Sequence, residues 1–79
     1  MKNKTIVDVR SEGEFMSGHV NGSINIPVQQ IPARMDELKN MKNIVLCCAS
    51  GGRSAQAMMY LKQHGIECEN AGSWLNLNN

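Results

Sequence analysis

The sequence lacks the features that would direct it to a membrane or to nucleic acid. None of its apolar runs approaches the roughly 20 residues that a membrane-spanning helix requires, and the N-terminal stretch MKNKTIVDVR has too short an apolar run for a signal peptide. The net charge is only +1 and the lysines are scattered, whereas binding to phosphate backbones needs clustered Lys and Arg. We therefore expect a cytoplasmic protein with no membrane and no nucleic-acid partner.

The sequence lacks the cysteine pattern that disulfides need. The three cysteines are an odd number, and Cys47 and Cys48 are adjacent, with Cys68 apart from them. This pattern does not build a disulfide framework but suits a reduced, reactive thiol. The histidines, cysteines and carboxylates show no metal-site spacing, and no internal repeat or linker is present. Because 79 residues suffice for one domain at most, we expect residues 1–79 to form a single domain.

Short apolar runs alternate with helical patterns along the chain, which predicts an α/β domain with a parallel sheet. The expected strands cover residues 5–9, 23–26, 43–47 and 66–68. The expected helices cover residues 12–16, a segment in which Ile31, Met35 and Leu38 have helical spacing, and residues 54–64. A short tail follows from Gly72-Ser73-Trp74.

Local signals mark several of these helix ends. Ser11 and Glu14 have the spacing of a capping box, which predicts a helix start. Pro32 is compatible with the first turn of a helix, where its missing N–H costs nothing. Gly65 is a favourable residue just beyond the end of the third helix.

The segment from Ile44 to Ala55 holds the residues that indicate chemistry. It places Cys48 at the carboxyl end of the most convincing buried strand, before a glycine-containing loop and the start of a helix. In open parallel sheets this crossing is where ligands bind. Consecutive N–H groups and the helix dipole favour an anion there, Gly51 and Gly52 give the loop its conformational freedom, and Arg53 offers a fork of donors. A cysteine in this field should have a lowered pKa and act as a nucleophile.

Two motifs resemble those of the rhodanese family, an N-terminal signature and, after it in the chain, an active-site loop. The active-site loop of that family is similar to CASGGRS, residues 48–54. Gly72-Ser73-Trp74 is similar to a weakened form of its glycine-then-tryptophan ending, and the resemblance spans about residues 6–74. The N-terminal signature is carried by Ile6-Val7-Asp8-Val9-Arg10, Glu14-Phe15, Gly18-His19-Val20, Gly22-Ser23 and Asn25-Ile26-Pro27.

The resemblance implies both a fold and an activity. The fold is a small, open parallel sheet of about four strands flanked by helices, lacking the usual first strand and helix. The activity is that of a thiosulfate-type sulfurtransferase, in which Cys48 takes sulfur from a donor such as thiosulfate, becomes a persulfide, and passes the sulfur to cyanide, a small thiol or a protein thiol. No metal or organic cofactor is implied. The residues implied to bind the donor are Ala49, Ser50, Gly51, Gly52, Arg53 and Ser54.

The chain departs from the family pattern in two places. It begins almost directly at the strand that ends in Asp8-Val9, which leaves a barer sheet edge and favours a monomer or a weak homodimer. Ala49 stands where many members carry a basic residue, so the expectation of efficient thiosulfate use is weaker. A catalytically weak sulfur carrier or binding module therefore remains an alternative.

Loop length leaves a second chemistry open. Four residues separate Cys48 from Arg53, as in the sulfurtransferase ring, whereas five separate Cys47 from Arg53, as in the wider cradle of the related dual-specificity phosphatases. A phosphatase or arsenate reductase is thus an alternative. The shorter ring is favoured because the family alignment places Cys47 inside the strand and because Leu46 occupies the position of the phosphatase histidine.

The other polar side chains are expected to serve the fold. Cys47 and Cys68 should be buried, His19 should hold its turn by hydrogen bonds, and His64 suits the end of its helix. Further expectations are an ion pair between Asp8 and Arg10 and solvated helix charges at Glu12, Glu14, Asp36 and Glu37. The resemblance offers one alternative role in the pocket, in which Trp74 covers one of its walls.

Overall fold

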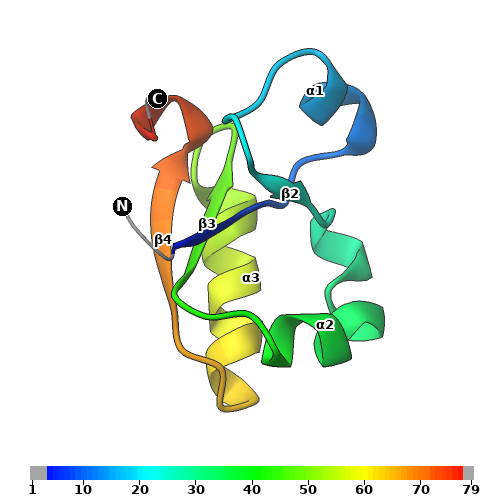
Figure 1. Ribbon diagram of the computed structural model, residues 1–79, viewed down its shortest axis with the longest axis vertical. Coiled ribbons are helices and arrows are strands. Elements are labelled where there is room, and N and C mark those ends of the chain that lie inside the picture. Colours follow the sequence, from blue (N-terminus) through cyan, green and yellow to red (C-terminus); the bar gives the residue numbers. More distant parts are fainter. Residues whose placement is uncertain (1–3, 78–79) are drawn as a thin grey trace.

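The centre of the molecule is a sheet of four parallel strands in the order β2-β1-β3-β4 (Figure 1). The structure is a computed structural model, which describes residues 4–77. The expected small parallel α/β sheet is confirmed. The strands are β1, Thr5–Asp8; β2, Ile24–Asn25; β3, Ile44–Cys48; and β4, Cys68–Ser73.

Helices and 3-10 turns connect these strands. In Figure 1 the longest helix, α3, lies behind the sheet, while α1 and the last 3-10 turn lie toward the end where β3 and β4 finish. Within residues 4–77, even α3 falls short of the apolar helix that a bilayer crossing demands. The α-helices are α1, Glu12–Met16; α2, Met35–Lys39; and α3, Gly52–Gln63, and the 3-10 turns are Val28–Gln30, Pro32–Arg34 and Trp74–Asn76.

The core lies between the sheet and α3. Every residue of β3 is buried, and Leu46 meets Ala57 and Leu61 from α3 in one hydrophobic cluster. Burying an aliphatic side chain of this size stabilises the fold by about 1.5–3 kcal/mol, so the packing fixes the end of β3 against the beginning of α3. The remaining buried members of the cluster are Val7, Val9, Ile26, Ile31, Leu38, Ile44 and Cys48.

The first helix begins as its sequence predicts. The hydroxyl of Ser11 accepts a hydrogen bond from the backbone N–H of Glu14 at 3.3 Å, and the Glu14 carboxylate accepts from the backbone N–H of Ser11 at 3.0 Å. This reciprocal pair satisfies two N–H groups that a helix start leaves unpaired. The capping box is confirmed, and it fixes the position of the Glu14 side chain.

The last strand was placed wrongly from the sequence. The expected strand at 66–68 ends where β4 begins, and the expected tail residues Gly72 and Ser73 belong to β4. Its residues Cys-Glu-Asn-Ala-Gly-Ser have no β-branched or alternating pattern, so the strand is specified by backbone pairing with β3 rather than by local propensity. The pairing contains a bulge, because Leu46 pairs with Asn70 whereas Cys47 pairs with Gly72.

The middle helix is shorter than its spacing suggests. Residues 28–34 form two 3-10 turns, and α2 begins only at Met35. Pro32 occupies the first position of the second turn, where its lack of an N–H breaks no hydrogen bond. Ile31 and Leu38 are nevertheless buried, as their periodicity predicts. The α3 end agrees with expectation, since Gly65 has φ of +79° just beyond it.

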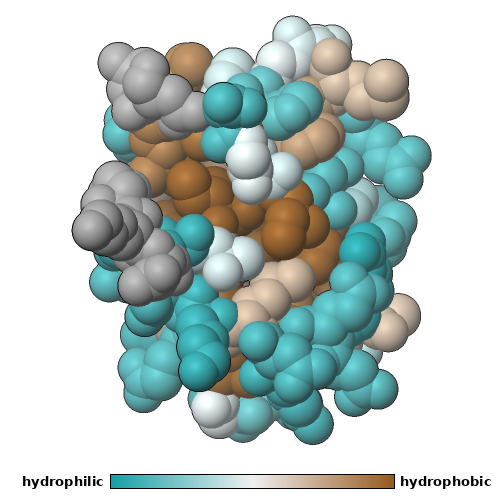
Figure 2. Space-filling model, in the orientation of Figure 1, coloured by the Kyte–Doolittle hydropathy of each residue, from teal (hydrophilic) through white to brown (hydrophobic). Residues whose placement is uncertain are grey.

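The sheet face turned away from α3 carries apolar surface. Figure 2 shows apolar side chains gathered across the middle of this face, between polar side chains at its margins. Ile24 on the edge strand β2 is one of the large apolar residues that are partly exposed. The loop that follows Cys48 lies at the carboxyl end of the sheet, near β4, α1 and the start of α3.

Candidate active site

The loop after β3 is a tight curl that requires glycine. Cys48 is the last residue of β3, and α3 begins at Gly52. Gly51 between them has φ of +104°, in the left-handed region that favours glycine, and a Cβ there would lie 3.4 Å from the Cα of Gly72. The expected freedom at Gly51 is therefore used where the loop turns into α3.

Hydrogen-bond donors converge on the sulfur of Cys48. The backbone N–H of Gly51 lies 2.9 Å from Sγ, and the backbone N–H of Ser54 lies 3.4 Å from it. The Ser54 hydroxyl oxygen is also 3.4 Å from Sγ. Cys48 and Ser54 are both buried, with exposed fractions of 1% and 0%. The loop thus forms a ring of donors around one sulfur atom at the first turn of a helix, where the helix dipole adds to the field.

These donors set the acidity of Cys48. Burial by itself raises the pKa of a thiol, but the hydrogen bonds from the Ser54 hydroxyl and from the backbone N–H groups of Ser54, Gly51 and Ser50 outweigh it. The pKa of Cys48 therefore lies below its ordinary value of 9.0. A larger thiolate fraction at neutral pH follows, and the thiolate is the nucleophilic form.

The neighbouring cysteine has the opposite environment. Cys47 is fully buried in β3, as expected, and burial together with the charge of Asp8 raises the pKa of its thiol to about 12. The thiol of Cys68 is half-buried, and burial raises its pKa as well. Cys47 is therefore a neutral core side chain, which argues physically against the five-residue loop count and the phosphatase chemistry that it would support.

Arg53 is held by a carboxylate from α1. Its two terminal nitrogens donate to the two carboxylate oxygens of Glu14 at 2.7 and 3.0 Å. This bidentate bond and the bond from the Ser11 backbone lower the pKa of Glu14 to about 2. The expectation that Glu14 is a solvated helix charge was wrong, because the capping box places it within reach of a residue 39 positions away. Arg53 thus stands beside the loop but is paired in this structure.

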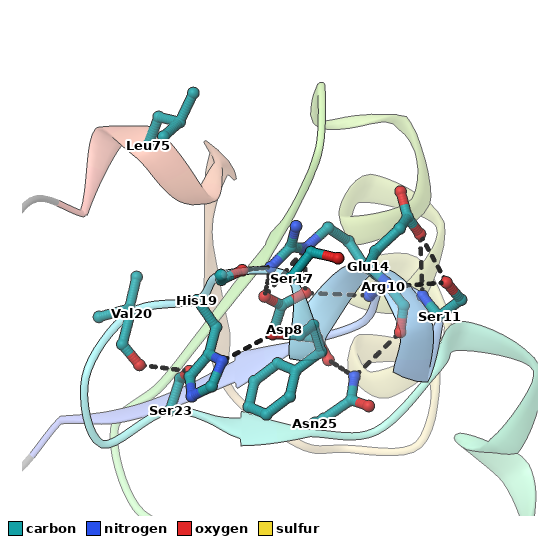
Figure 3. A network of polar contacts seen from close by, with 12 residues as sticks. Asp8, Arg10, Ser11, Glu14, Ser17, His19, Val20, Ser23, Asn25 and Leu75 are labelled. Atoms are coloured by element: carbon teal, nitrogen blue, oxygen red, sulfur yellow. Dashed lines mark hydrogen bonds and ion pairs between the residues drawn. The ribbon is translucent and has the colours of Figure 1, made fainter.

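A buried ion pair frames the end of β1. Arg10 donates to both carboxylate oxygens of Asp8, at 3.0 and 2.8 Å, and also to the Gly18 carbonyl at 2.7 Å (Figure 3). The guanidinium lies 4.5 Å from the centre of the Trp74 ring, which places a cation over an aromatic face. The expected Asp8–Arg10 pair is confirmed, and Trp74 contributes by fixing the C-terminal turn against β1.

The histidines serve turns and helix ends. Nδ1 of His19 lies 2.7 Å from the Phe15 carbonyl, and its ring stacks on the Phe15 ring at 3.7 Å (Figure 3). Nδ1 of His64 lies 2.9 Å from the Tyr60 carbonyl at the end of α3. Among residues 4–77, no three His, Cys, Asp or Glu side chains are placed to hold a metal ion.

Sequence reasoning missed Asn70. Its side-chain oxygen accepts a hydrogen bond from the Ser54 hydroxyl at 2.7 Å and from the backbone N–H of Gly72 at 2.9 Å. The spacing Asn-Ala-Gly is typical of a turn in which the Asn side chain bonds to the backbone two residues on, and this signal was available in the sequence. The bond to Ser54 follows only from the pairing of β3 with β4. Of the six expected donor-binding residues, three are exposed, two are half-buried and one is buried; these are, in that order, Ala49, Ser50 and Gly52, then Gly51 and Arg53, then Ser54.

A cysteine of lowered pKa, surrounded by backbone N–H donors on a small parallel α/β sheet, is a combination that can be compared with known proteins. The model of the rhodanese-like domain family, which matches residues 1–76, shows that this chain belongs to that family. A sulfurtransferase of Allochromatium vinosum is 38% identical over 60 residues, covering 76% of this chain and 56% of the relative. The chain spans about half the length of the curated relatives it matches.

Solved structures agree with this assignment. A rhodanese-related protein from Thermoplasma volcanium is 32% identical with a TM-score of 0.85, over 94% of this chain and 74% of that chain. A rhodanese with anions from E. coli is 31% identical with a TM-score of 0.84, over 95% of this chain and 92% of that chain. The resemblance stated from the sequence is therefore confirmed for the family and the fold.

Proposed function

We propose that this chain, as a single rhodanese-like domain of residues 1–79, transfers sulfane sulfur through a persulfide on Cys48. The observation that carries the proposal is the convergence of donors from Gly51 and Ser54 on the Cys48 sulfur, together with the lowered pKa of that thiol. Both favour a thiolate that attacks a sulfur donor. The named activity of the Allochromatium relative supports the same chemistry.

The reaction consists of two displacements. With thiosulfate as donor, the Cys48 thiolate attacks the outer sulfur, a new S–S bond forms, and the old S–S bond breaks so that sulfite leaves with its electron pair. The negative charge of the persulfide then resides mainly on its outer sulfur. A nucleophilic acceptor, which is cyanide, a small thiol or a protein thiol, attacks that outer sulfur and releases the Cys48 thiolate. No electrons enter or leave, so the cycle needs no redox cofactor.

The loop is suited to hold the donor during this exchange. The proposed binding groups are the N–H groups from Ala49 to Ser54 and the Arg53 side chain. Arg53 donates two N–H groups to Glu14, and a guanidinium has five, so donors remain for an oxyanion. That the E. coli rhodanese structure contains anions supports an anion site in this fold.

A sulfur carrier with weak catalysis is the second candidate. The observation that favours it is the engagement of Arg53 by Glu14, which occupies much of the only positive charge in the loop. Such a protein would accept sulfur on Cys48 and keep it until a specific protein thiol removed it. Slow turnover with cyanide and a long-lived persulfide would distinguish this carrier from an efficient enzyme.

Mass spectrometry after thiosulfate treatment tests the proposal. Trypsin releases residues 43–53 as one peptide, which contains both Cys47 and Cys48, so substitutions are needed to assign the modified residue. We expect one added sulfur atom on this peptide in the native protein and in Cys47→Ser, and none in Cys48→Ser. Sulfur that persists in Cys48→Ser would overturn the assignment, and phosphate-ester hydrolysis without sulfur transfer would favour the phosphatase alternative.

A further inference from the structure

A chain of polar contacts continues beyond Cys48 into the interior. The Cys48 sulfur lies 3.4 Å from the Ser54 hydroxyl oxygen, which lies 2.7 Å from Oδ1 of Asn70. The same hydroxyl oxygen is 3.1 Å from the Gly51 carbonyl oxygen. Ser54 is fully buried, so water does not replace these partners. The two displacements described above use the sulfur and the ring but give no role to Asn70.

The backbone of β4 fixes which atom of Asn70 faces Ser54. The Gly72 N–H donates to this same atom at 2.9 Å, so the atom must be an acceptor and is the carbonyl oxygen of the amide. The bulge in the β3–β4 pairing accompanies this arrangement. Ala71 has no partner on β3, and Gly72, with φ of +81°, directs its N–H toward the Asn70 side chain. Asn70 therefore presents a fixed acceptor to Ser54.

The Ser54 hydroxyl has one proton and more than one acceptor. When Cys48 is a thiol, its S–H can donate to the Ser54 oxygen while the Ser54 proton bonds to Asn70. When Cys48 is a thiolate, the strongest bond available to the Ser54 proton is to the charged sulfur. The Asn70 oxygen then keeps only the Gly72 N–H. The Asn70 oxygen and the sulfur thus compete for one proton.

We propose that Asn70 is a positioning residue for Cys48. Its side-chain carbonyl oxygen accepts the hydrogen bond from the Ser54 hydroxyl whenever the sulfur of Cys48 is uncharged. When that sulfur becomes a thiolate, the Ser54 hydroxyl donates to the sulfur instead. The role in turnover depends on the proposed sulfur transfer. Persulfide formation moves the charge to the outer sulfur, so the hydroxyl turns back to Asn70, and release of the sulfur to an acceptor reverses the turn. Only the hydroxyl torsion changes, and no proton leaves the site.

The thiolate pKa of Cys48 is the readout for this role, and it does not depend on sulfur transfer. Ultraviolet absorbance of the thiolate is followed against pH, with Cys48→Ser as the blank. Asn70→Ala removes the nearer of the two carbonyl acceptors that compete with the sulfur for the Ser54 proton, and it leaves the Gly51 carbonyl oxygen at 3.1 Å. The thiol form of Cys48 loses its better partner, so we expect the pKa of Cys48 to fall by up to about one unit, which is at most the equivalent of one hydrogen bond. Ser54→Ala removes a donor to the thiolate and should raise the pKa. In the Ser54→Ala background, Asn70→Ala should have no effect.

A purely structural Asn70 gives the opposite sign. If Asn70 only braced the turn, its loss would loosen the loop and weaken the N–H bonds to sulfur, so the pKa of Cys48 would rise. A higher or unchanged pKa of Cys48 in Asn70→Ala would overturn the proposal. So would a fall caused by Asn70→Ala that is equally large in the Ser54→Ala background. Asn76→Ala is the matched control, because Asn76 donates to the Ala71 carbonyl at 2.9 Å in the same turn but does not bond to Ser54. It should leave the pKa of Cys48 unchanged.

A second substitution keeps the test decisive if Asn70→Ala fails to fold. Asn70→Asp preserves shape and offers a stronger acceptor, so it should raise the pKa of Cys48, and by more with Ser54 present than in Ser54→Ala. An equal rise in both backgrounds would overturn the proposal, because charge alone would explain it.

The charged groups around Cys48 stay constant in the Ala variants. Arg53 on α3 is paired with Glu14 on α1, and Asp8 with Arg10 at the end of β1. Cys47 is the titratable neighbour on β3. On β4, Glu69 pairs with Lys4. The pKa measurement also separates this inference from the proposed function. The expected shifts without persulfide formation would uphold the role of Asn70 in acidity and refute the sulfur transfer. Persulfide formation with no shift in Asn70→Ala would do the reverse.

Discussion

Two cysteines that are adjacent in the chain lie in opposite chemical environments. Cys47 and Cys48 are almost equally buried, at 0% and 1% exposed, yet the pKa of Cys47 is raised to about 12 while that of Cys48 is lowered. Burial raises the pKa of both thiols, and the charge of Asp8 adds to the rise at Cys47. At Cys48 the hydrogen bonds from Ser54 and Gly51 outweigh burial. Burial alone therefore does not decide the pKa of a thiol, because the donors that the loop after β3 supplies lower it at Cys48.

The largest expected effect comes from breaking the donor ring at Gly51. In Gly51→Ala, a residue with a Cβ must adopt φ of +104°, and the relaxation that follows displaces the N–H that lies 2.9 Å from the Cys48 sulfur. Removing one such donor from an enzyme site typically costs on the order of 100-fold or more in rate. We expect that loss in the rate of persulfide formation from thiosulfate, measured by quenched reaction and mass spectrometry.

Gly13→Ala is the control for this substitution. Gly13 lies in α1, and a Cβ there would have no neighbour within 4 Å. The rate should remain native and the helix should gain slightly in stability. A native rate in Gly51→Ala would mean that the ring does not activate Cys48, and the contrast between the two cysteines would lose its explanation.

The next effect is on stability at alkaline pH and concerns Cys47. Its folded pKa of about 12 exceeds the ordinary value of 9.0, so between these values the folded state keeps a proton that the unfolded state has lost. The contribution of Cys47 to the free energy of unfolding is fully present below about pH 9. It is lost as pH rises toward 12, at up to about 1.4 kcal/mol per pH unit. We expect the native protein to lose free energy of unfolding more steeply over this range than Cys47→Ala, measured by urea denaturation.

Cys48 makes the opposite contribution. Its folded pKa is below its ordinary value, so its contribution is present above pH 9 and is lost as pH falls through the lowered pKa. Between the lowered pKa and pH 9, the free energy of unfolding of the native protein should therefore rise with pH through Cys48, and this rise should be absent from Cys48→Ala. Equal slopes for the native protein and Cys47→Ala above pH 9 would contradict the assignment of a neutral core thiol to Cys47.

The smallest expected effect concerns the Glu14–Arg53 pair beside the ring. Glu14→Gln removes a carboxylate that binds Arg53 through two hydrogen bonds, so more of the guanidinium becomes available to an anionic donor. We expect a severalfold lower KM for thiosulfate with little change in Tm, because both side chains are partly exposed. Since the pKa of Glu14 is about 2, the native pair should not contribute to pH dependence between pH 5 and 8. A higher KM would mean that the pair holds Arg53 in its binding position.

Local signals in the sequence predicted the elements that surround Cys48. The apolar run at 44–47 specifies β3, the Ser11–Glu14 spacing specifies the start of α1, and the glycine-containing loop specifies the site at Cys48. Each of these depends on a few neighbouring residues and on burial, which a sequence displays directly.

The parts that could not be predicted depend on contacts distant in sequence. Residues 68–73 have a polar composition and become a strand only because β3 offers a pairing edge. Asn70 meets Ser54 only after that pairing forms with its bulge, and Glu14 meets Arg53 only after the fold brings α1 near the start of α3. Propensity and spacing do not record such partners, so the contacts of Asn70 with Ser54 and of Glu14 with Arg53 emerged from the structure alone.

The most direct test of the central claim is the titration of the two cysteines in a matched pair of variants. Thiolate absorbance is measured against pH in Cys47→Ser, which retains Cys48, and in Cys48→Ser, which retains Cys47. We predict a thiolate step below pH 9 in Cys47→Ser that is absent from Cys48→Ser. A step at or above pH 9 for Cys48, or the same step in both variants, would contradict the claim that the ring of donors makes one of two adjacent thiols acidic.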